Sequence, residues 1–223
     1  MQMLLGTVTS APCIAVEAEA MNDNMFLLTP SGTAVDCITG DNAFRVCFAD
    51  PAQGTASAKF IGERKLAEKI AVIYDSSDPY SSGMYGAFQA EAANQPFEIV
   101  AAEAFTADNK TDFSVQLQKA KDAGADMVYV PFYYNEIALV LKQAADMGFE
   151  PTWFGVDGMD GILSMEGFDT ALAEDAMLLT PFSATAEDEK TQAFVAKYQE
   201  LYGEIPNQFG ADAYDGVYII KAA

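Results

Sequence analysis

Alternation between apolar strand-like runs and helix-like segments constrains the fold of this chain more than any other feature of its sequence. The run KIAVIYD (residues 69–75) is followed by the helical segment YSSGMYGAFQAEAAN (residues 80–94), and this order recurs along most of the chain. The strand-like runs from Lys69 onward are continuously apolar, as expected for strands covered on both faces. The alternation predicts an α/β fold in which parallel sheets are flanked by helices. Among the predicted elements are strands at residues 43–49 and 176–183, and a helix at residues 112–124 that ends at Gly124.

Charge and composition exclude several classes of function. Acidic residues outnumber basic ones by 33 to 12, which argues against nucleic acid and anionic membrane surfaces as partners. The chain has no histidine, so Ser-His-Asp and Cys-His catalysis are excluded. Neither a P-loop nor a GxGxxG after the first strand is present. We therefore expect a protein that is not an enzyme and carries no cofactor. The alternative is an enzyme on a flavodoxin-like fold that uses Lys, Glu or Asp chemistry, which the fold alone does not exclude.

The three cysteines, Cys13, Cys37 and Cys47, show no CxxC spacing, so no metal site is expected from them. Two interpretations stay open for these residues. Cys37 and Cys47 could close a small disulfide loop in an oxidising compartment, or all three could be buried thiols without a disulfide.

Polar clusters follow the strand-like runs, and ligands of open α/β sheets bind beyond the carboxyl ends of strands. Ser10 ends the cluster after the first run, and Ser31, Gly32 and Thr33 follow the second run, each before a predicted helix. Free backbone N–H groups and the helix dipole make such a place suitable for an anion such as a carboxylate. The alternative is that Ser10 and Thr33 are ordinary helix N-caps.

Later clusters supply aromatic side chains and an acid. Tyr80 and Tyr133 follow two of the strand-like runs, and Asp157 follows a third. An acid beside hydroxyl groups can hold an ammonium group, so the clusters together suit a zwitterionic α-amino acid. The alternatives are that the tyrosines lie at the surface or the edge of the core, and that Asp157 before Gly158 is a turn residue.

The segments GTVTSAP, LLTPSGTA, FRVCFADPAQGTASAKFI, KIAVIYDSSDPYSSG, DFSVQLQKAKDAGADMVYVPFYYNE, LVLKQAADMGF and WFGVDGMD occur in this order along the chain. Together they resemble the substrate-binding proteins of branched-chain amino acid ABC transporters, which have the type I periplasmic binding fold. The resemblance implies two lobes, with lobe II at residues 51–183 and an incomplete lobe I at residues 1–50 and 184–223. It also implies that the chain is a fragment of a longer protein.

By the same resemblance, Ser10, Ser31 and Thr33 bind the carboxylate and ammonium groups of the ligand, and Gly32 allows close approach of the backbone. Tyr80 and Tyr133 supply aromatic contacts from lobe II. Asp157 pairs with the ammonium group, at a position where some members of the family have glutamate.

The resemblance implies an extracytoplasmic protein, periplasmic or anchored at the cell surface, that delivers an aliphatic amino acid to a membrane permease. The full-length protein is expected to be a monomer. The alternative is a sensing regulator or receptor domain with the same fold, which passes ligand-induced closure to a different partner.

Overall fold

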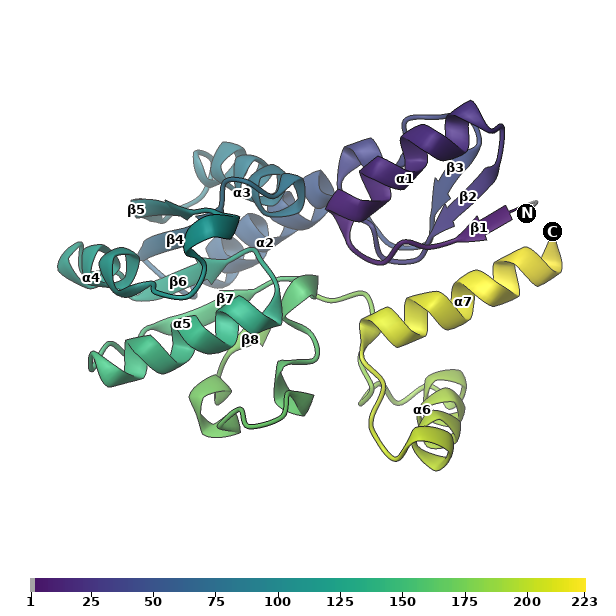
Figure 1. Ribbon diagram of the computed structural model, residues 1–223. Helices are drawn as coiled ribbons and strands as arrows, with labels where there is room; N and C mark the ends of the chain where they lie inside the picture. The colour runs from purple at the N-terminus through teal and green to yellow at the C-terminus, as the bar shows by residue number, and fades with distance from the viewer. Residues whose placement is uncertain (1–2) are drawn as a thin grey trace. The chain divides into compact units, whose positions relative to one another are not determined.

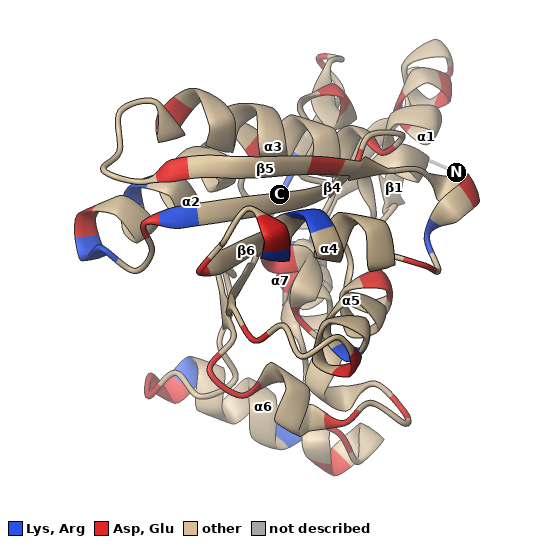
Figure 2. Cartoon of the chain, turned by 90° about the vertical axis from the view of Figure 1, so that its left-hand side faces the viewer, with Lys and Arg blue, Asp and Glu red and all other residues tan. Residues whose placement is uncertain are grey.

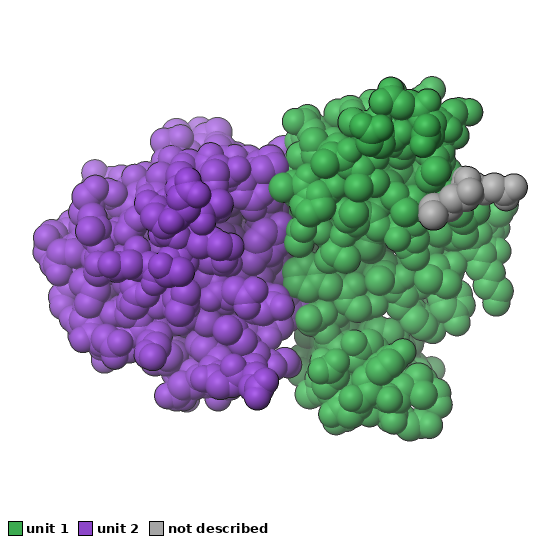
Figure 3. Space-filling model, viewed as in Figure 1, with its two compact units in different colours: residues 1–49, 180–223 green, residues 50–179 purple. Residues whose placement is uncertain are grey.

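The computed structural model describes residues 3–223, which fall into two compact units (Figure 3). Unit 1 contains the chain up to Ala49 and the stretch from Thr180 to Ala223, and unit 2 contains Asp50–Leu179. Each unit has its own parallel sheet with helices packed against it (Figure 1). The assignment of units 1 and 2 to lobes I and II, with the boundaries given above, remains a proposal.

The sheet of unit 2 has five parallel strands in the order β5-β4-β6-β7-β8. Their bounds are β4 Lys69–Asp75, β5 Glu98–Phe105, β6 Met127–Val130, β7 Thr152–Gly155 and β8 Met177–Leu178. Four α-helices belong to this unit, namely α2 Asp50–Arg64, α3 Pro79–Ala92, α4 Ser114–Asp122 and α5 Tyr134–Asp146. Short 3-10 helices occur at Ala107–Asn109, Asp157–Met159, Ile162–Ser164 and Thr170–Ala173.

The interior strand β4 is buried on both faces. Ile70 and Val72 belong to the core cluster that contains apolar residues of α2 and α3. The alternate residues Ala71 and Ile73 belong to a second cluster, which contains residues of α4 and α5. Since successive side chains of a strand point to opposite faces, continuous apolar sequence is required here. The prediction of a parallel sheet flanked by helices is confirmed.

Local signals explain where several helices of unit 2 begin and end. Asp78 is the N-cap of α3, where its side chain accepts a hydrogen bond from the backbone N–H of Tyr80 at 3.3 Å, and Pro79 is the first helical residue. Gly124 follows the C-cap of α4 with a φ of +71°, a conformation that glycine adopts without strain. The predicted end of this helix at Gly124 is confirmed.

Unit 1 has a three-stranded parallel sheet in the order β1-β2-β3. Its elements are β1 Met3–Leu5, α1 Ser10–Asn22, β2 Phe26–Thr29, the 3-10 helix η1 Val35–Ile38, β3 Ala43–Arg45, α6 Glu189–Tyr202 and α7 Gln208–Ala222. Residues of α1, including Cys13 and Ala20, form a buried cluster with Leu27 and Ala43 of the sheet. Helix α7 approaches β1 at Gly216, where a Cβ atom would lie 2.8 Å from a methyl group of Leu5.

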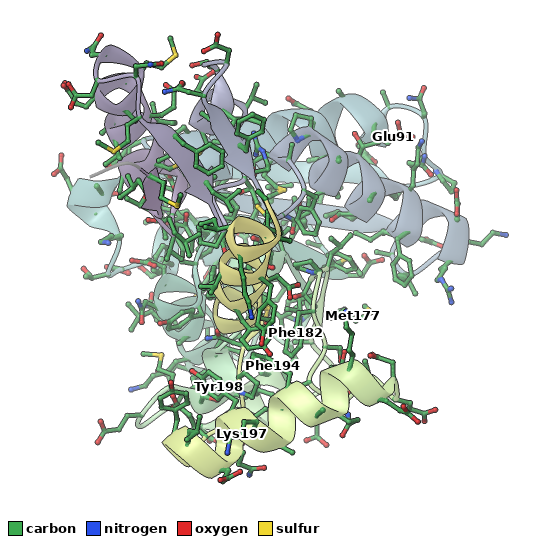
Figure 4. All side chains as sticks on the ribbon, turned by 90° about the vertical axis from the view of Figure 1, so that its right-hand side faces the viewer. Glu91, Met177, Phe182, Phe194, Lys197 and Tyr198 are labelled. Carbon is green, nitrogen blue, oxygen red and sulfur yellow. The ribbon has the colours of Figure 1, made fainter. Side chains whose placement is uncertain are left out.

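Aromatic rings join the two C-terminal helices of unit 1. The Phe194 ring of α6 lies 4.7 Å from the Tyr214 ring of α7, measured between centroids, and 5.9 Å from the Phe182 ring. Figure 4 shows Phe182, Phe194 and Tyr198 gathered at α6. Several apolar side chains of α7 remain exposed, among them Val217, Tyr218 and Ile219.

Two strands are shorter than the sequence predicts. The strand predicted at residues 43–49 ends at Arg45, opposite Thr29, the last residue of β2. Beyond it the backbone N–H groups of Val46 and Cys47 still donate to the carbonyl oxygens of Thr29 and Pro30, but regular strand pairing does not continue. The strand predicted at residues 176–183 is reduced to Met177–Leu178, because the chain leaves unit 2 after Leu179. Among residues 3–223, no helix is both long enough and apolar enough to cross a bilayer.

Candidate functional site

A buried hydrogen-bond network surrounds Asp157 in unit 2. Asp157 begins a 3-10 helix directly after β7 and is 2% exposed. Its Oδ1 atom accepts a hydrogen bond of 2.6 Å from the Tyr80 hydroxyl and one of 2.8 Å from Nε2 of Gln53. The carboxylate therefore lies at the carboxyl end of the interior strand β7, where it accepts hydrogen bonds from two neutral donors.

The Tyr80 hydroxyl is both a donor and an acceptor. It donates to Asp157 and accepts a hydrogen bond of 2.9 Å from the backbone N–H of Gly158. Burial, followed by the negative charge of Asp157, raises the pKa of Tyr80 well above its usual value of 10. The phenol consequently stays protonated and remains a donor to the carboxylate.

Tyr133 lies against this network through its ring. The Tyr80 and Tyr133 rings are stacked, with centroids 4.8 Å apart and an angle of 21° between their planes. A Cβ atom at Gly158 would lie 2.6 Å from the Tyr80 hydroxyl oxygen and 2.8 Å from the Phe132 carbonyl oxygen, so only glycine fits there. The structure thus brings together the three residues Tyr80, Tyr133 and Asp157, which the sequence analysis had selected separately.

The other four selected residues lie in unit 1. The Ser31 hydroxyl donates a hydrogen bond of 2.8 Å to Oδ2 of Asp212 on α7. The Gly32 N–H donates a hydrogen bond of 2.9 Å to Oγ1 of Thr29. A Cβ atom at Gly32 would lie 2.7 Å from that oxygen, so glycine is required by packing inside unit 1. Thr33 is buried beside these residues.

Ser10, which follows β1, is hydrogen-bonded to the loop that follows β2. Its side-chain oxygen accepts a hydrogen bond of 3.1 Å from the backbone N–H of Ala34. The alternative interpretation of Ser10 and Thr33 as N-caps is wrong, because Thr9 is the N-cap of α1 and Ala34 is the N-cap of η1. The Ser10 hydroxyl instead fixes the loop that contains Ser31, Gly32 and Thr33.

Three residues that the sequence analysis missed support these two clusters. They are Gln53 in unit 2, and Arg45 and Asp212 in unit 1. Arg45 donates to the carbonyl oxygens of Gly32, Thr33 and Ala34, and so holds the backbone of the loop after β2. None of the three belongs to a polar cluster that follows a strand, so the sequence pattern does not indicate them.

The cysteines form neither a disulfide nor a metal site in the part of the chain that the structure describes. Within residues 3–223, the three cysteines form no disulfide, so the expected alternative of a Cys37–Cys47 bond is wrong. Cys13 and Cys37 are fully buried, and a hydrogen bond to Cys13 together with burial raises the pKa of Cys37. The same part of the chain contains no group of three or more acidic or cysteine side chains arranged to bind a metal ion.

The α/β fold of both units, together with the match to a family signature, places the chain in the class of solute-binding proteins. The chain belongs to the periplasmic binding protein family, whose signature it matches over residues 1–223. Its fold is the type I fold of that family.

Curated relatives support the same family. The chain is 28% identical over 204 residues to the leucine-, isoleucine-, valine-, threonine- and alanine-binding protein of Pseudomonas aeruginosa. The match covers 89% of this chain and 53% of that relative. The chain thus spans about half the length of this curated relative.

Solved structures match over nearly the whole chain. The substrate-binding protein LivJ of Streptococcus pneumoniae, in complex with isoleucine, is 30% identical with a TM-score of 0.85, and the match covers 99% of this chain and 63% of LivJ. The leucine-binding protein LivK of Thermotoga maritima is 28% identical with a TM-score of 0.83, and the match covers 98% of this chain and 62% of LivK.

Proposed function

We propose that this chain forms an amino-acid-binding part of the substrate-binding protein of an ABC importer. The observation that carries the proposal is the buried Asp157 carboxylate at the carboxyl end of β7, held by Gln53 and Tyr80. Both of these donors are neutral side chains. An ammonium group is the chemistry that such a carboxylate recognises.

The hydroxyl-bearing residues of unit 1 would bind the other end of the ligand. In this proposal Ser10, Ser31 and Thr33 contact the carboxylate and ammonium groups, and Gly32 allows close approach of the backbone. Tyr80 and Tyr133 provide an aromatic wall for the aliphatic part. The ligand stabilises the state in which both sets of groups contact it, which is how binding would produce closure.

The substrate class rests on the relatives. The Pseudomonas aeruginosa relative binds leucine, isoleucine, valine, threonine and alanine, and the Streptococcus pneumoniae structure contains isoleucine. We therefore propose an aliphatic α-amino acid as the ligand of this chain. We also propose delivery to a membrane permease by a monomeric protein outside the cytoplasmic membrane, as a periplasmic protein or a surface lipoprotein.

Isothermal titration calorimetry with leucine, isoleucine, valine, threonine and alanine tests the proposal directly. We expect micromolar affinity for at least one of them, which corresponds to about 8 kcal/mol of binding free energy. Asp157→Asn should abolish most of this affinity, because it removes the charge that pairs with the ammonium group. If the unchanged protein binds none of the five amino acids, the proposed substrate class is wrong.

Thr33→Ala tests the role of the unit 1 loop. Since Thr33 would contact the group shared by all amino acids, the variant should weaken binding of every one of them to a similar extent. Weakening restricted to one amino acid would show that Thr33 contacts the ligand side chain instead.

A further inference from the structure

Gln53 lies in the first turns of α2, is 1% exposed and makes two hydrogen bonds to a single residue. Its Nε2 atom donates to Oδ1 of Asp157 at 2.8 Å, and its Oε1 atom accepts from the backbone N–H of Asp157 at 2.8 Å. Only one orientation of the amide satisfies both bonds, because its oxygen cannot donate and its nitrogen cannot accept. The Gln53 amide is therefore fixed against both the side chain and the backbone of Asp157.

The Asp157 oxygen that Gln53 contacts is the one that Tyr80 contacts. Oδ1 thus receives two donors, while the hydroxyl of Tyr80 is itself held by the Gly158 N–H. A carboxylate with one oxygen fixed by two donors, and with its own backbone N–H bound to the same amide, has little rotational freedom. Burial strengthens each of these bonds, because water does not compete for them.

We propose that Gln53 is a positioning residue, which aims the Asp157 carboxylate at the ammonium group of the ligand. This inference rests on the proposed function, in which Asp157 binds that ammonium group. Gln53 itself would not touch the ligand. Its effect would be to favour ligands that carry an ammonium group over ligands of the same shape that lack one, since only the former depend on the direction of the carboxylate.

The substitution Gln53→Met separates positioning from packing, because methionine is of similar size but cannot replace either hydrogen bond. The measurement is the affinity for the preferred amino acid and for its 2-hydroxy acid analogue, which keeps the carboxylate and side chain but has no ammonium group. We expect Gln53→Met to lower affinity for the amino acid by about tenfold or more, as losing charge-assisted hydrogen bonds predicts. The affinity for the hydroxy acid should change much less.

Gln118→Met is a matched control. Gln118 also donates through Nε2 to an aspartate, Asp122, at 2.7 Å, but this pair is exposed on α4. The control should therefore leave both affinities unchanged, and thermal unfolding of each variant shows that it is folded.

Gln53→Glu provides a second test by conservative rescue. A protonated carboxyl group can donate to Oδ1 and accept from the N–H as the amide does, whereas an ionised one repels Asp157. The surrounding ionisable groups are Asp157, Tyr80 and Tyr133, with Asp50 also acting on Tyr80 through its charge. Burial and these negative charges raise the pKa of the introduced carboxyl group and favour its protonated form, so the amino acid affinity relative to the unchanged protein should recover as the pH is lowered.

The outcomes distinguish this inference from the proposed function. If the unchanged protein binds amino acids and Gln53→Met lowers both ligand affinities equally, Gln53 has only a structural role and the inference is overturned. Unchanged amino acid affinity in Gln53→Met overturns it as well, and in both cases the proposed function stands. If the unchanged protein binds no amino acid, the proposed function and the inference are both wrong.

Discussion

The Tyr80 hydroxyl connects a backbone amide to a carboxylate through a single buried oxygen. This arrangement ties the stability of unit 2 to the protonation of a phenol. Burial raises the pKa values of both Tyr80 and Tyr129 above the usual value, whereas in the unfolded chain both would ionise near pH 10.

Unit 2 should therefore lose stability in alkaline solution. Above about pH 10 the unfolded state releases protons that the folded state retains, so the free energy of unfolding falls by about 1.4 kcal/mol per pH unit for each buried tyrosine. Below that pH both states are protonated and this contribution is constant. Urea unfolding measured across the alkaline range checks the slope.

Tyr80→Phe is the variant to compare. At neutral pH it should lower the free energy of unfolding by about 1–3 kcal/mol, because the Gly158 N–H loses its acceptor and Asp157 loses a donor. Its alkaline slope should be shallower than that of the unchanged protein, since one buried titrating group is gone. Parallel slopes for the two proteins would show that Tyr80 does not titrate with unfolding.

Thiol reactivity is a second prediction at the scale of the residue. Cys13 and Cys37 are fully buried, whereas Cys47 is only partly buried. One thiol should react rapidly with a water-soluble disulfide reagent in the folded protein, and three should react in denaturant. Cys47→Ser should remove the rapid reaction, and a rapid phase that persists in this variant would contradict the burial described above.

Candidate site residues were predictable only where they follow strands. Tyr80, Tyr133 and Asp157 could be selected because parallel strands deliver their carboxyl ends to one edge. Gln53 could not be, because it precedes the strands and meets Asp157 across 104 positions of sequence. Spacing along the chain carries no information on such a contact. The hydrogen bond between Ser31 and Asp212 joins residues 181 positions apart and was unpredictable for the same reason.

At the scale of the element, the packing of α2 against α3 depends on Gly54. A Cβ atom at this position would lie 2.5 Å from the carbonyl oxygen of Met84 and 3.0 Å from the backbone nitrogen of Phe88. Both atoms belong to the α3 backbone, so a side chain could be accommodated only by moving the helix. Gly54 therefore fixes how closely the two helices approach.

Gly54→Ala should lower the free energy of unfolding by about 1–3 kcal/mol through overpacking. Gly86→Ala is the matched control, because Gly86 lies within α3 and a Cβ atom there meets nothing within 4 Å. The control should raise stability by about 0.5–1 kcal/mol, since alanine is the better helix former. Equal effects of the two substitutions in urea unfolding would contradict the close approach of α2 and α3.

The order and type of most elements were predictable, whereas strand lengths were not. Continuous apolar runs such as residues 69–75 are specific enough to predict buried parallel strands, and β4 has exactly these bounds. The runs at residues 43–49 and 176–183 were apolar for other reasons. The first run continues past β3 as an irregular segment, whose Val46 and Cys47 N–H groups still donate to the carbonyl oxygens of Thr29 and Pro30. The second run carries the chain from one unit to the next.

At the scale of the whole molecule, excess negative charge is the dominant electrostatic feature. The net charge is −21, and Figure 2 shows acidic residues spread over helices and loops. Such a charge keeps a protein soluble but weakens the folded state through self-repulsion. Ion pairs between exposed side chains, such as Lys197–Glu200, contribute little against this repulsion.

Screening should therefore stabilise the protein. Raising sodium chloride from about 0.01 M to about 0.5 M shortens the Debye length several-fold and should raise the melting temperature by a few degrees. Potassium chloride at equal ionic strength should have the same effect, because screening depends on ionic strength and not on the identity of the cation. A melting temperature that falls with salt would show that attractive ion pairs outweigh the repulsion.

The short contact between the Tyr80 oxygen and Asp157 Oδ1, 2.6 Å long and shielded from bulk water, has a practical consequence. Its bridging proton should exchange slowly enough to give a separate downfield signal in the NMR spectrum. A ligand that binds Asp157 would change the electron density on the carboxylate and so change the chemical shift of that proton. The protein would thus carry an intrinsic, label-free reporter of occupancy at its own binding residue.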